Sequence, residues 1–472
     1  MTVLTPDEAE RDWDVDDVVV TEPSTIRRAI GAAAIGNITE WYDFGVYAYF
    51  SPTIEKVFFH GLNDTAGAIA TAGLFAAAFL VRPFGGLFFG PLADRIGRNR
   101  VLATTMILMA LGTFSIGCIP SEHSIGVFAP MLLLVARLVQ GFSTGGEYGN
   151  AMTFISEYAP DRKRGFWGSW LEFGTFTGYL MGAIIVTVVT ATVSEGTLVS
   201  WAWRIPFFVA LPLGVIGVYL RVKLGDTPAY LALESESEER EKENKAGKEL
   251  KRILRLWPYL LVCMGLVLAW NVTNYMLTSY MPTYVTSTVP KYQGGSGVSE
   301  TTSEILQIIV MAIALVLIPL VGMLSDRVGR KPIVYVGSIG LVVLAFPSIL
   351  LIRSQSIAGV FGGLLIMGLL LICFSATMPS TLPSLFPTQV RSGALSIAFN
   401  VSVSLFGGTT SVVVTSLVGA TGNLDWPAIY LVATGLIGVA SISFMFEPNG
   451  KKMWGSAPAA ATHEEAVELV EA

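Results

Sequence analysis

The sequence predicts an all-α multi-pass membrane protein with twelve transmembrane helices, arranged as two six-helix bundles. Three observations support this prediction. Of the 472 residues, 52% are hydrophobic and 14% are charged, and the mean hydropathy is +0.60. Twelve apolar runs are each long enough to cross a bilayer, which takes about 20 residues. One loop sequence also occurs twice, about half a chain length apart.

The low charge content excludes several classes of protein. A soluble domain carries roughly 25% charged residues, so this chain has too little charge to cover a water-facing surface. The formal net charge of −6 argues against a general nucleic-acid binder. Cys118, Cys263 and Cys373 lie far apart and show no CxxC spacing, so the sequence predicts neither a disulfide framework nor a zinc site.

The twelve apolar runs define the predicted transmembrane helices. They span residues 27–51, 68–93, 101–120, 127–150, 166–192, 204–223, 257–281, 304–324, 332–353, 357–380, 392–418 and 427–447. Residues 1–26 are acidic rather than basic, which is not the pattern of a secretory signal. We therefore expect the first run to remain as a membrane span.

Basic residues predict the orientation of the chain. If the N-terminus is cytoplasmic, 24 of the 30 Lys and Arg residues fall in cytoplasmic segments and four fall outside. The remaining two, Arg82 and Arg137, lie within helices. Such an asymmetry follows the positive-inside rule, so both termini are expected in the cytoplasm.

The two halves of the chain repeat each other. Residues 90–99 (GPLADRIGRN) and 322–331 (GMLSDRVGRK) are identical at six of ten positions, at an offset of 232. Because six helices separate the copies, both lie on the same membrane side, which defines a parallel repeat. The predicted organisation is an acidic cytoplasmic tail, an N-terminal bundle, a cytoplasmic linker, a C-terminal bundle and a short cytoplasmic tail, at 1–26, 27–223, 224–256, 257–447 and 448–472.

The repeated loop predicts a gate between the bundles. An Asp at a helix end can pair with a nearby Arg and with the N-terminus of a helix in the other bundle. Ordinary positive-inside charge explains the arginines of the loop but not the Asp and Gly at the same spacing twice. The predicted gating residues are Gly90, Asp94, Arg95 and Arg98 in the first copy and Asp326, Arg327 and Arg330 in the second.

Further motifs accompany the repeated loop, and together they carry a family resemblance. They are Gly36-Asn-Ile-Thr-Glu40-Trp-Tyr-Asp43-Phe-Gly45, Arg82-Pro-Phe-Gly-Gly86, Gln140-Gly-Phe-Ser-Thr-Gly-Gly-Glu147-Tyr148 and Glu157-Tyr-Ala-Pro-Asp-Arg-Lys-Arg-Gly165. The chain resembles the major facilitator superfamily and, within it, the metabolite:proton symporter family. Residues 165–174, 203–208, 271–277 and 380–387 are most similar to the osmoregulatory proline/glycine betaine transporters of that family. The resemblance implies a major facilitator fold in a bacterial cytoplasmic (inner) membrane.

Ionisable residues within the predicted spans are candidates for proton coupling, because charges inside a bilayer are costly. Glu40 and Asp43 are three residues apart and share one face of the first helix. Burial of a carboxyl group favours its proton-bearing form. We expect Glu40, Asp43 or both to exchange the coupling proton, with Arg137 or Glu147 biasing them. The alternative is a static buried ion pair or a polar packing contact.

Aromatic and amide side chains are candidates for substrate binding. A zwitterion such as proline or glycine betaine needs an aromatic or acceptor surface for its cationic end and a donor for its carboxylate. The candidates are Trp41, Tyr42, Tyr47, Tyr148, Trp270, Asn271, Asn274 and Tyr275. For each ring the alternative is helix packing or an interfacial belt.

These observations predict a secondary transporter, a symporter of protons with zwitterionic osmolytes that works by alternating access. No nucleotide-binding motif occurs, so the expected energy source is the proton gradient, without a cofactor or metal. The main alternative is a symporter of an organic acid such as 2-oxoglutarate, citrate or shikimate. An enzyme or sensor lacks support, because no catalytic constellation or phosphate-binding loop occurs. The expected partners are the osmolyte, the proton and the lipid bilayer, with no nucleic acid. A monomer is expected, because the segment after the last helix is too short for a coiled coil.

Overall fold

The computed structural model describes residues 13–96, 98–145, 147–224, 252–295 and 297–471. The helical segments of the first half are α1 (Pro23–Tyr49), α3 (Asp64–Leu80) with α4 (Arg82–Ile96), α5 (Arg98–Cys118), α7 (Phe128–Ser143) with α8 (Glu147–Tyr158), α9 (Arg164–Thr192) and α11 (Ile205–Leu224). Those of the second half are α14 (Trp257–Tyr275) continuing to α16 (Val289–Gln293), α17 (Glu300–Val328), α18 (Arg330–Arg353), α19 (Ile357–Ser375) with α20 (Met378–Thr381), α21 (Arg391–Ser402) with α22 (Thr410–Thr421), and α23 (Trp426–Phe444).

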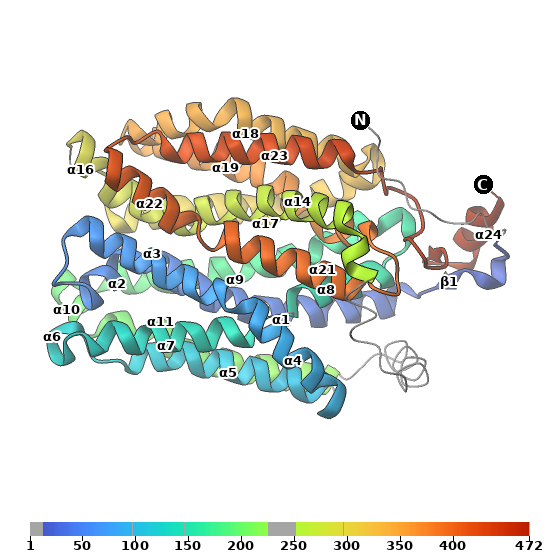
Figure 1. Cartoon of the computed structure of the whole chain (residues 1–472), viewed down its shortest axis with the longest axis horizontal. Helices are drawn as coiled ribbons and strands as arrows, with labels where there is room; N and C mark the ends of the chain where they lie inside the picture. Colours follow the sequence, from blue (N-terminus) through green and yellow to red (C-terminus); the bar gives the residue numbers. More distant parts are fainter. Residues whose placement is uncertain (1–12, 97, 146, 225–251, 296, 472) are drawn as a thin grey trace.

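These segments form the predicted twelve-helix membrane fold (Figure 1). In the described part of the chain, nine helices are long and apolar enough to cross a membrane, and two more apolar helices are shorter. The twelfth is α1, which carries Arg27, Arg28, Glu40 and Asp43 and is therefore more polar. The predicted fold class is confirmed, and each predicted run corresponds to one helical segment.

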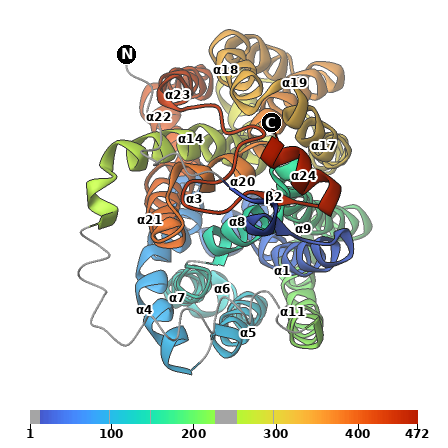
Figure 2. The ribbon, with the colours of Figure 1, turned by 90° about the vertical axis from the view of Figure 1, so that its right-hand side faces the viewer.

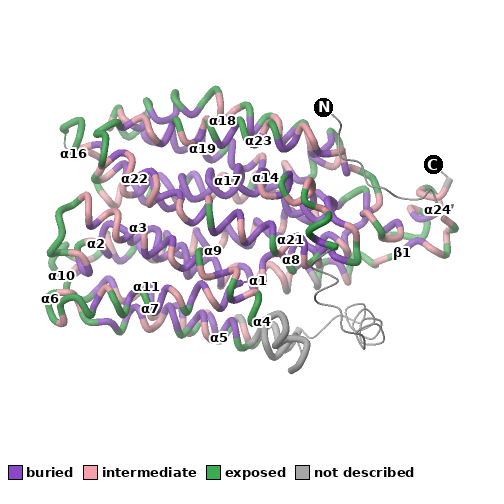
Figure 3. The backbone as a smooth tube through the Cα atoms, viewed as in Figure 1, coloured by how far each residue is buried: buried purple, intermediate pink, exposed green. Residues whose placement is uncertain are grey.

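Large apolar side chains cover the outer faces of several helices. On α18, for example, Val336, Ile339, Val343 and Leu350 are exposed. A soluble protein rarely exposes such a continuous apolar face. Figure 3 shows the buried residues along the middle of the molecule and exposed ones on the outward faces and in the end loops. The exposed apolar faces are those that a bilayer would cover.

The two halves lie side by side and meet along two pairs of helices. Helix α9 of the first half packs against α17 of the second, and α3 packs against α22. Figure 2 shows the first-half helices α4, α5, α7 and α11 grouped away from α17, α18, α19 and α23. The two halves of the sequence therefore form two separate bundles, which contact each other through α9 with α17 and through α3 with α22.

Within the first half, glycines let backbones approach closely. A Cβ atom on Gly141 would lie 1.7 Å from the carbonyl oxygen of Ala78, and one on Gly145 would lie 2.0 Å from that of Arg82. Only glycine fits at such distances. The break between α3 and α4, where Arg82 lies, is therefore held firmly against α7.

Two spans contain π-helical turns. The seventh span includes η4 (Met276–Tyr280) and η5 (Tyr284–Thr288), and the eleventh includes η7 (Val403–Gly407). The seventh span was predicted to end at residue 281 but continues to Gln293, because the polar residues after Pro282 remain helical. Single π-turns occur often at functional sites, and η4 directly follows Tyr275.

Both described ends of the chain lie together at one end of the molecule, named here the terminal end (Figure 1). Strands β1 (Val19–Val20) and β2 (Ala459–Ala460) pair in parallel, and α24 (His463–Glu471) packs beside them. The short helices α2 (Ser51–Phe58), α6 (Glu122–Ile125) and α10 (Glu195–Ser200), together with α16, lie at the opposite, distal end. The predicted domain boundaries remain predictions, and most of the predicted linker, 225–251, lies outside the described residues.

Candidate functional site

A buried charged cluster lies at the centre of the first bundle. Helix α1 places Glu40, which is 4% exposed, against Arg82, which is 1% exposed, at the α3–α4 break. The Nη2 atom of Arg82 donates a hydrogen bond to Oε1 of Glu40 at 3.2 Å. The guanidinium carbon of Arg82 also lies 4.6 Å from the ring centre of Phe79 and 4.7 Å from that of Phe44. Glu40 and Arg82 therefore form a buried ion pair held between rings.

Asp43 lies one turn farther along α1 and differs from Glu40. Asp43 is 1% exposed, and neither carboxylate oxygen has a hydrogen-bond partner among the described residues. Arg137 on α7 is close enough to act on Asp43 electrostatically, but its Nη1 donates to Oε1 of Gln140 at 2.8 Å. Gln140 in turn donates to Oγ1 of Thr113 at 2.5 Å. The hydroxyl of Thr113 also lies near the Asp43 carboxylate, but it donates to the carbonyl oxygen of Met109 at 3.1 Å. Asp43 is thus a buried carboxyl with Arg137 as a nearby cation and without a direct ion pair.

The remaining proton-coupling candidate, Glu147, lies at the start of α8 and is partly buried. A different carboxyl on α9, that of Glu172, is 2% exposed and accepts hydrogen bonds from the hydroxyls of Tyr148 and Thr175. Glu172 therefore connects the charged helices of the first bundle to the aromatic residues described next.

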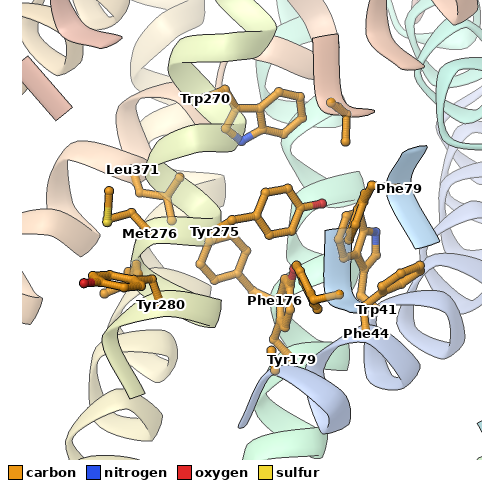
Figure 4. Packing of buried hydrophobic residues seen from close by; sticks show 14 of the residues in the cluster. Trp41, Phe44, Phe79, Phe176, Tyr179, Trp270, Tyr275, Met276, Tyr280 and Leu371 are labelled. Atoms are coloured by element: carbon orange, nitrogen blue, oxygen red, sulfur yellow. The ribbon is translucent and has the colours of Figure 1, made fainter. Parts of the chain in front are cut away.

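Four predicted aromatic residues meet between the bundles. The ring centres of Trp41 and Tyr148 are 5.9 Å apart, those of Tyr148 and Trp270 are 6.1 Å apart, and those of Trp41 and Tyr275 are 6.5 Å apart. Figure 4 shows Tyr275 projecting from α14 toward Phe79 and Trp41. Because Trp41 and Tyr148 belong to the first half while Trp270 and Tyr275 belong to the second, both bundles contribute to the group.

Two further rings complete this group and were not among the predicted residues. Phe399 on α21 stacks on Tyr148 at 5.0 Å, and Tyr179 on α9 lies 5.4 Å from Trp41. We name the six residues the aromatic cage: Trp41, Tyr148, Tyr179, Trp270, Tyr275 and Phe399. A sequence signal existed for Tyr179, because Gly178 and Gly182 mark the face of α9 that packs on α1. The sequence gives no comparable signal for Phe399, which lies within the apolar run 392–418.

Unpartnered polar atoms lie at the cage. The hydroxyl of Tyr275 and the Oδ1 atom of Asn274 are buried without a hydrogen-bond partner in the described structure. The Nε atom of Arg82 is likewise without a partner, and the Arg82 guanidinium lies 5.7 Å from the Trp41 ring centre. Buried polar atoms normally have partners, so these donors and acceptors are available to a ligand.

Three of the predicted substrate residues lie outside the cage. The hydroxyl of Tyr42 donates to the carbonyl oxygen of Pro206 at 2.8 Å, so this residue faces α11. The hydroxyl of Tyr47 donates to the carbonyl oxygen of Thr71 at 3.1 Å, and the ring centre of Tyr47 lies 4.1 Å from the guanidinium carbon of Arg137. The side-chain amide of Asn271 donates to Val267 one turn earlier on its own helix, at 3.1 Å. These three side chains therefore make packing and hydrogen-bond contacts outside the cage.

The gate predicted for the second loop copy is a contact between the bundles. The two carboxylate oxygens of Asp326, at the end of α17, accept hydrogen bonds from the backbone N–H groups of Gly165 and Phe166 at 2.7 and 2.8 Å. Those N–H groups belong to the first turn of α9 in the other half. A carboxylate at a helix N-terminus is stabilised by the helix dipole. Asp326 therefore fastens the terminal ends of the two bundles together.

The other predicted gating residues differ in their surroundings. Arg330 is fully buried, with Nη2 3.7 Å from Oδ1 of Asp326, whereas Arg327 is exposed. The surroundings of Gly90 and the side chains of Asp94, Arg95 and Arg98 in the first copy lie outside the part of the structure that is described. A second contact between the halves joins Arg391 to Glu157 at 2.6 Å.

One buried carboxyl of the second half was not among the predicted site residues. Glu304, near the distal end of α17, is 3% exposed, and its Oε2 atom has no hydrogen-bond partner among the described residues. It lies near Thr187 and Thr190 of α9. Glu304 is the first residue of the predicted run 304–324, a position typical of the membrane–water interface.

No group of three or more His, Cys, Asp or Glu side chains among the described residues could hold a metal ion. The functional geometry thus consists of the charged cluster, the aromatic cage and the gate contacts at the terminal end.

The sequence is similar to several named transporters over nearly its whole length. It is 45% identical over 461 residues to the glycine betaine/proline/ectoine/pipecolic acid transporter OusA of Dickeya dadantii, covering 97% of this chain and 90% of that protein. It is 44% identical to the proline/betaine transporter of Escherichia coli K12, covering 96% and 90%. It is 39% identical to the ectoine/proline transporter ProP of Corynebacterium glutamicum, covering 97% and 91%.

The fold also matches solved structures. The proton:xylose symporter XylE, bound to a bromo-deoxyglucose, aligns with a TM-score of 0.72 at 19% identity, covering 92% of this chain and 98% of that one. An inward-open structure of XylE from E. coli aligns with a TM-score of 0.69 at 19% identity, covering 94% and 99%. The family model described as "Sugar (and other) transporter" matches residues 29–453. The chain belongs to this transporter family of the major facilitator superfamily.

Proposed function

We propose that this chain is a proton-coupled symporter that imports zwitterionic osmolytes such as proline and glycine betaine by alternating access. The observation that carries the proposal is the aromatic cage, which both bundles build. Several rings together bind a quaternary or secondary ammonium through cation–π contacts. The names of the relatives, which include glycine betaine, proline and ectoine transporters, support the same substrate class.

The cage supplies contacts for both ends of such a substrate. Its rings would face the cationic end, and Oδ1 of Asn274 would accept from an N–H group where proline carries one. The carboxylate would receive donors from the unpartnered Nε of Arg82 and the hydroxyl of Tyr275. Because the rings come from both halves, a bound osmolyte would favour closure of the bundles around it.

Asp43 is the proposed proton carrier. Glu40 is paired with Arg82 at 3.2 Å, which fits the alternative of a static ion pair for that residue. Asp43 has no hydrogen-bond partner in the described structure, and an unpaired buried carboxyl gains from binding a proton. The proton gradient across the membrane would then drive uptake, without a cofactor.

The membrane setting completes the proposal. The chain would work as a monomer in the lipid bilayer of a bacterial cytoplasmic membrane, with the terminal end facing the cytoplasm, as the basic residues predict. In that orientation the Asp326 contacts close the cytoplasmic side. The described structure would therefore be a state that is closed to the cytoplasm.

An organic acid remains the second candidate, and one observation favours it. Two arginines are buried near the centre, Arg82 and Arg137, each at most 1% exposed. Glu40 neutralises Arg82, which weakens this candidate. Uptake of labelled glycine betaine, proline and 2-oxoglutarate into proteoliposomes tests both. Uptake of betaine and proline supports the proposal, and uptake of 2-oxoglutarate alone would replace the substrate class.

A further inference from the structure

A polar cavity lies at the distal end of the molecule, between the bundles and away from the aromatic cage. Its volume is about 430 Å³. Helices α2 and α3 of the first half line one side, and η5, α16, the start of α17 and α22 of the second half line the other. Like the cage, this cavity is shared by both bundles, so its shape depends on their relative position.

The cavity wall carries charges of both signs. Glu55, Lys56 and Asp64 come from the first half, and Lys291 and Glu300 come from the second. Lys56 is already paired with Glu195 of α10 at 2.8 Å. Lys291 reaches across the cavity, where Nζ donates to Oγ1 of Thr65 at 2.9 Å and lies 3.7 Å from Oδ2 of Asp64.

The ion pair between Lys291 and Asp64 is open to replacement of Asp64 by another carboxylate. The Asp64 side chain is 87% exposed and that of Lys291 is 39% exposed, and an ion pair so open to water is weak. An incoming carboxylate can therefore replace Asp64 as the partner of Lys291. Tyr292, the next residue on α16, also lines the cavity and offers an aromatic face.

Glu55 lies where this cavity meets a smaller one beneath it. Its carboxylate makes no hydrogen bond or ion pair among the described residues, and it lines both cavities. The smaller cavity is lined by Glu55, two alanines and seven hydroxyl residues, namely Ser51, Thr71, Ser279, Tyr280, Thr283, Ser411 and Thr415. This smaller cavity has a volume of only about 10 Å³, room for about one water molecule, and it places polar groups between Glu55 and the distal ends of α3 and η4.

We propose that the distal cavity is an entry site that binds the zwitterionic osmolyte before it reaches the aromatic cage, with Lys291 receiving the carboxylate and Glu55 the cationic end. The substrate class in this inference rests on the proposed function. A ligand with a single charge engages one of the two groups, whereas a zwitterion engages both and leaves the net charge of the cavity unchanged. The cavity therefore selects zwitterions at the first step.

The charges around Glu55 make this contact sensitive to pH. Burial and the neighbouring carboxylate of Asp64 raise the pKa of Glu55 to about 7, although Lys291 and Lys56 oppose the shift. The other ionisable groups that line the cavity are Glu300 at the start of α17 and the Tyr292 hydroxyl. Below neutral pH, Glu55 therefore binds a proton and loses its attraction for the cationic end of the ligand.

Initial uptake rates of labelled glycine betaine into proteoliposomes test the proposal, with Glu55→Gln, Lys291→Gln and the double variant compared with the parent chain. Glu122→Gln is the matched control, because Glu122 lies on α6 at the same end and does not line the cavity. Each single variant is expected to raise KM about two- to fivefold, the contribution of one partly exposed charge contact, while kcat stays within about twofold.

High external ionic strength provides a second readout, because screening weakens exposed charge contacts. The KM of the parent is expected to rise toward that of the double variant as salt increases, and the double variant is expected to change little. Unchanged KM in both single variants, with normal protein levels, would overturn the entry site. Absence of betaine and proline uptake by the parent chain would instead overturn the proposed function.

Discussion

Oε1 of Glu40 lies 3.2 Å from Nη2 of Arg82, whereas Asp43, one turn later on α1, has no hydrogen-bond partner in the described structure. Two carboxyls that share one helix face thus have different surroundings. Removing Glu40 leaves a buried arginine without the carboxylate that hydrogen-bonds it, whereas removing Asp43 breaks no hydrogen bond and takes away only the electrostatic interaction with Arg137. This difference supports the proposal that Glu40 has a structural role and that Asp43 exchanges the proton.

Asp43→Asn is therefore expected to abolish accumulation of substrate against a gradient while preserving exchange. The amide has the shape of the acid but carries no proton between the two sides. Counterflow of labelled betaine in proteoliposomes without a proton gradient should stay within about threefold of the parent. Proton-driven uptake should fall to the level of empty vesicles. Full accumulation by the Asp43→Asn protein would show that the proton is carried elsewhere.

Glu40→Gln is expected to lower the stability of the protein more than Asp43→Asn does. Breaking a buried pair by removing one partner costs about 3–5 kcal/mol, because the Arg82 charge then lacks a counter-ion. The midpoint of thermal unfolding in detergent, measured by fluorescence, compares the two variants. Equal midpoints would contradict the structural role of the Glu40–Arg82 pair.

Tyr275→Phe is expected to raise KM for betaine by up to about tenfold, which corresponds to the loss of about one hydrogen bond to a charged group. The variant keeps the ring of the cage and removes only the unpartnered hydroxyl. Tyr42→Phe is the matched control, because the hydroxyl of Tyr42 bonds Pro206 outside the cage. Similar increases of KM in both variants would argue against the cage as the substrate site.

Asp326→Asn is expected to shift the transporter toward the state that opens at the terminal end. The change removes the charge that two N–H groups of α9 and Arg330 share, a contribution of about 1–2 kcal/mol. Labelling of a cysteine placed at Ser380, buried near Gly168, reports opening in a background without the native cysteines. The labelling rate should rise about tenfold. Arg327→Gln, at an exposed position, should leave it unchanged.

Equilibrium binding of betaine in detergent should weaken as the pH falls from 8 to 6. Glu55, with a pKa of about 7, becomes neutral over this range, so its contribution is present above pH 7 and lost below it. In the Glu55→Gln variant this part of the pH dependence should disappear. A parent affinity that is independent of pH in this range would contradict a charged role for Glu55.

The sequence predicted the fold well because apolar run length is set by the bilayer itself. Each of the twelve runs became a helical segment. The extension of the seventh span to Gln293 was missed, because polar residues such as Thr283 and Thr286 end an apolar run without ending a helix. The pairing of β1 with β2 was missed as well, because two-residue strands have no sequence signature.

The candidate site was predicted less completely. Trp41, Tyr42 and Asp43 follow one another on α1, and successive residues on a helix are about 100° apart, so they cannot all face one cavity. Only the packing of α11 against α1 shows that Tyr42 faces outward from the cage. Phe399 and Glu304 were missed, because their roles arise from contacts with the opposite bundle.

Uptake of labelled glycine betaine under an imposed inward proton gradient tests the central claim most directly. The parent protein and its Asp43→Asn variant would be measured in the same proteoliposomes, with and without a protonophore. The account predicts accumulation by the parent that collapses with the protonophore and is absent in the variant. Betaine uptake that is unaffected by the proton gradient, or equal in the two proteins, would contradict it.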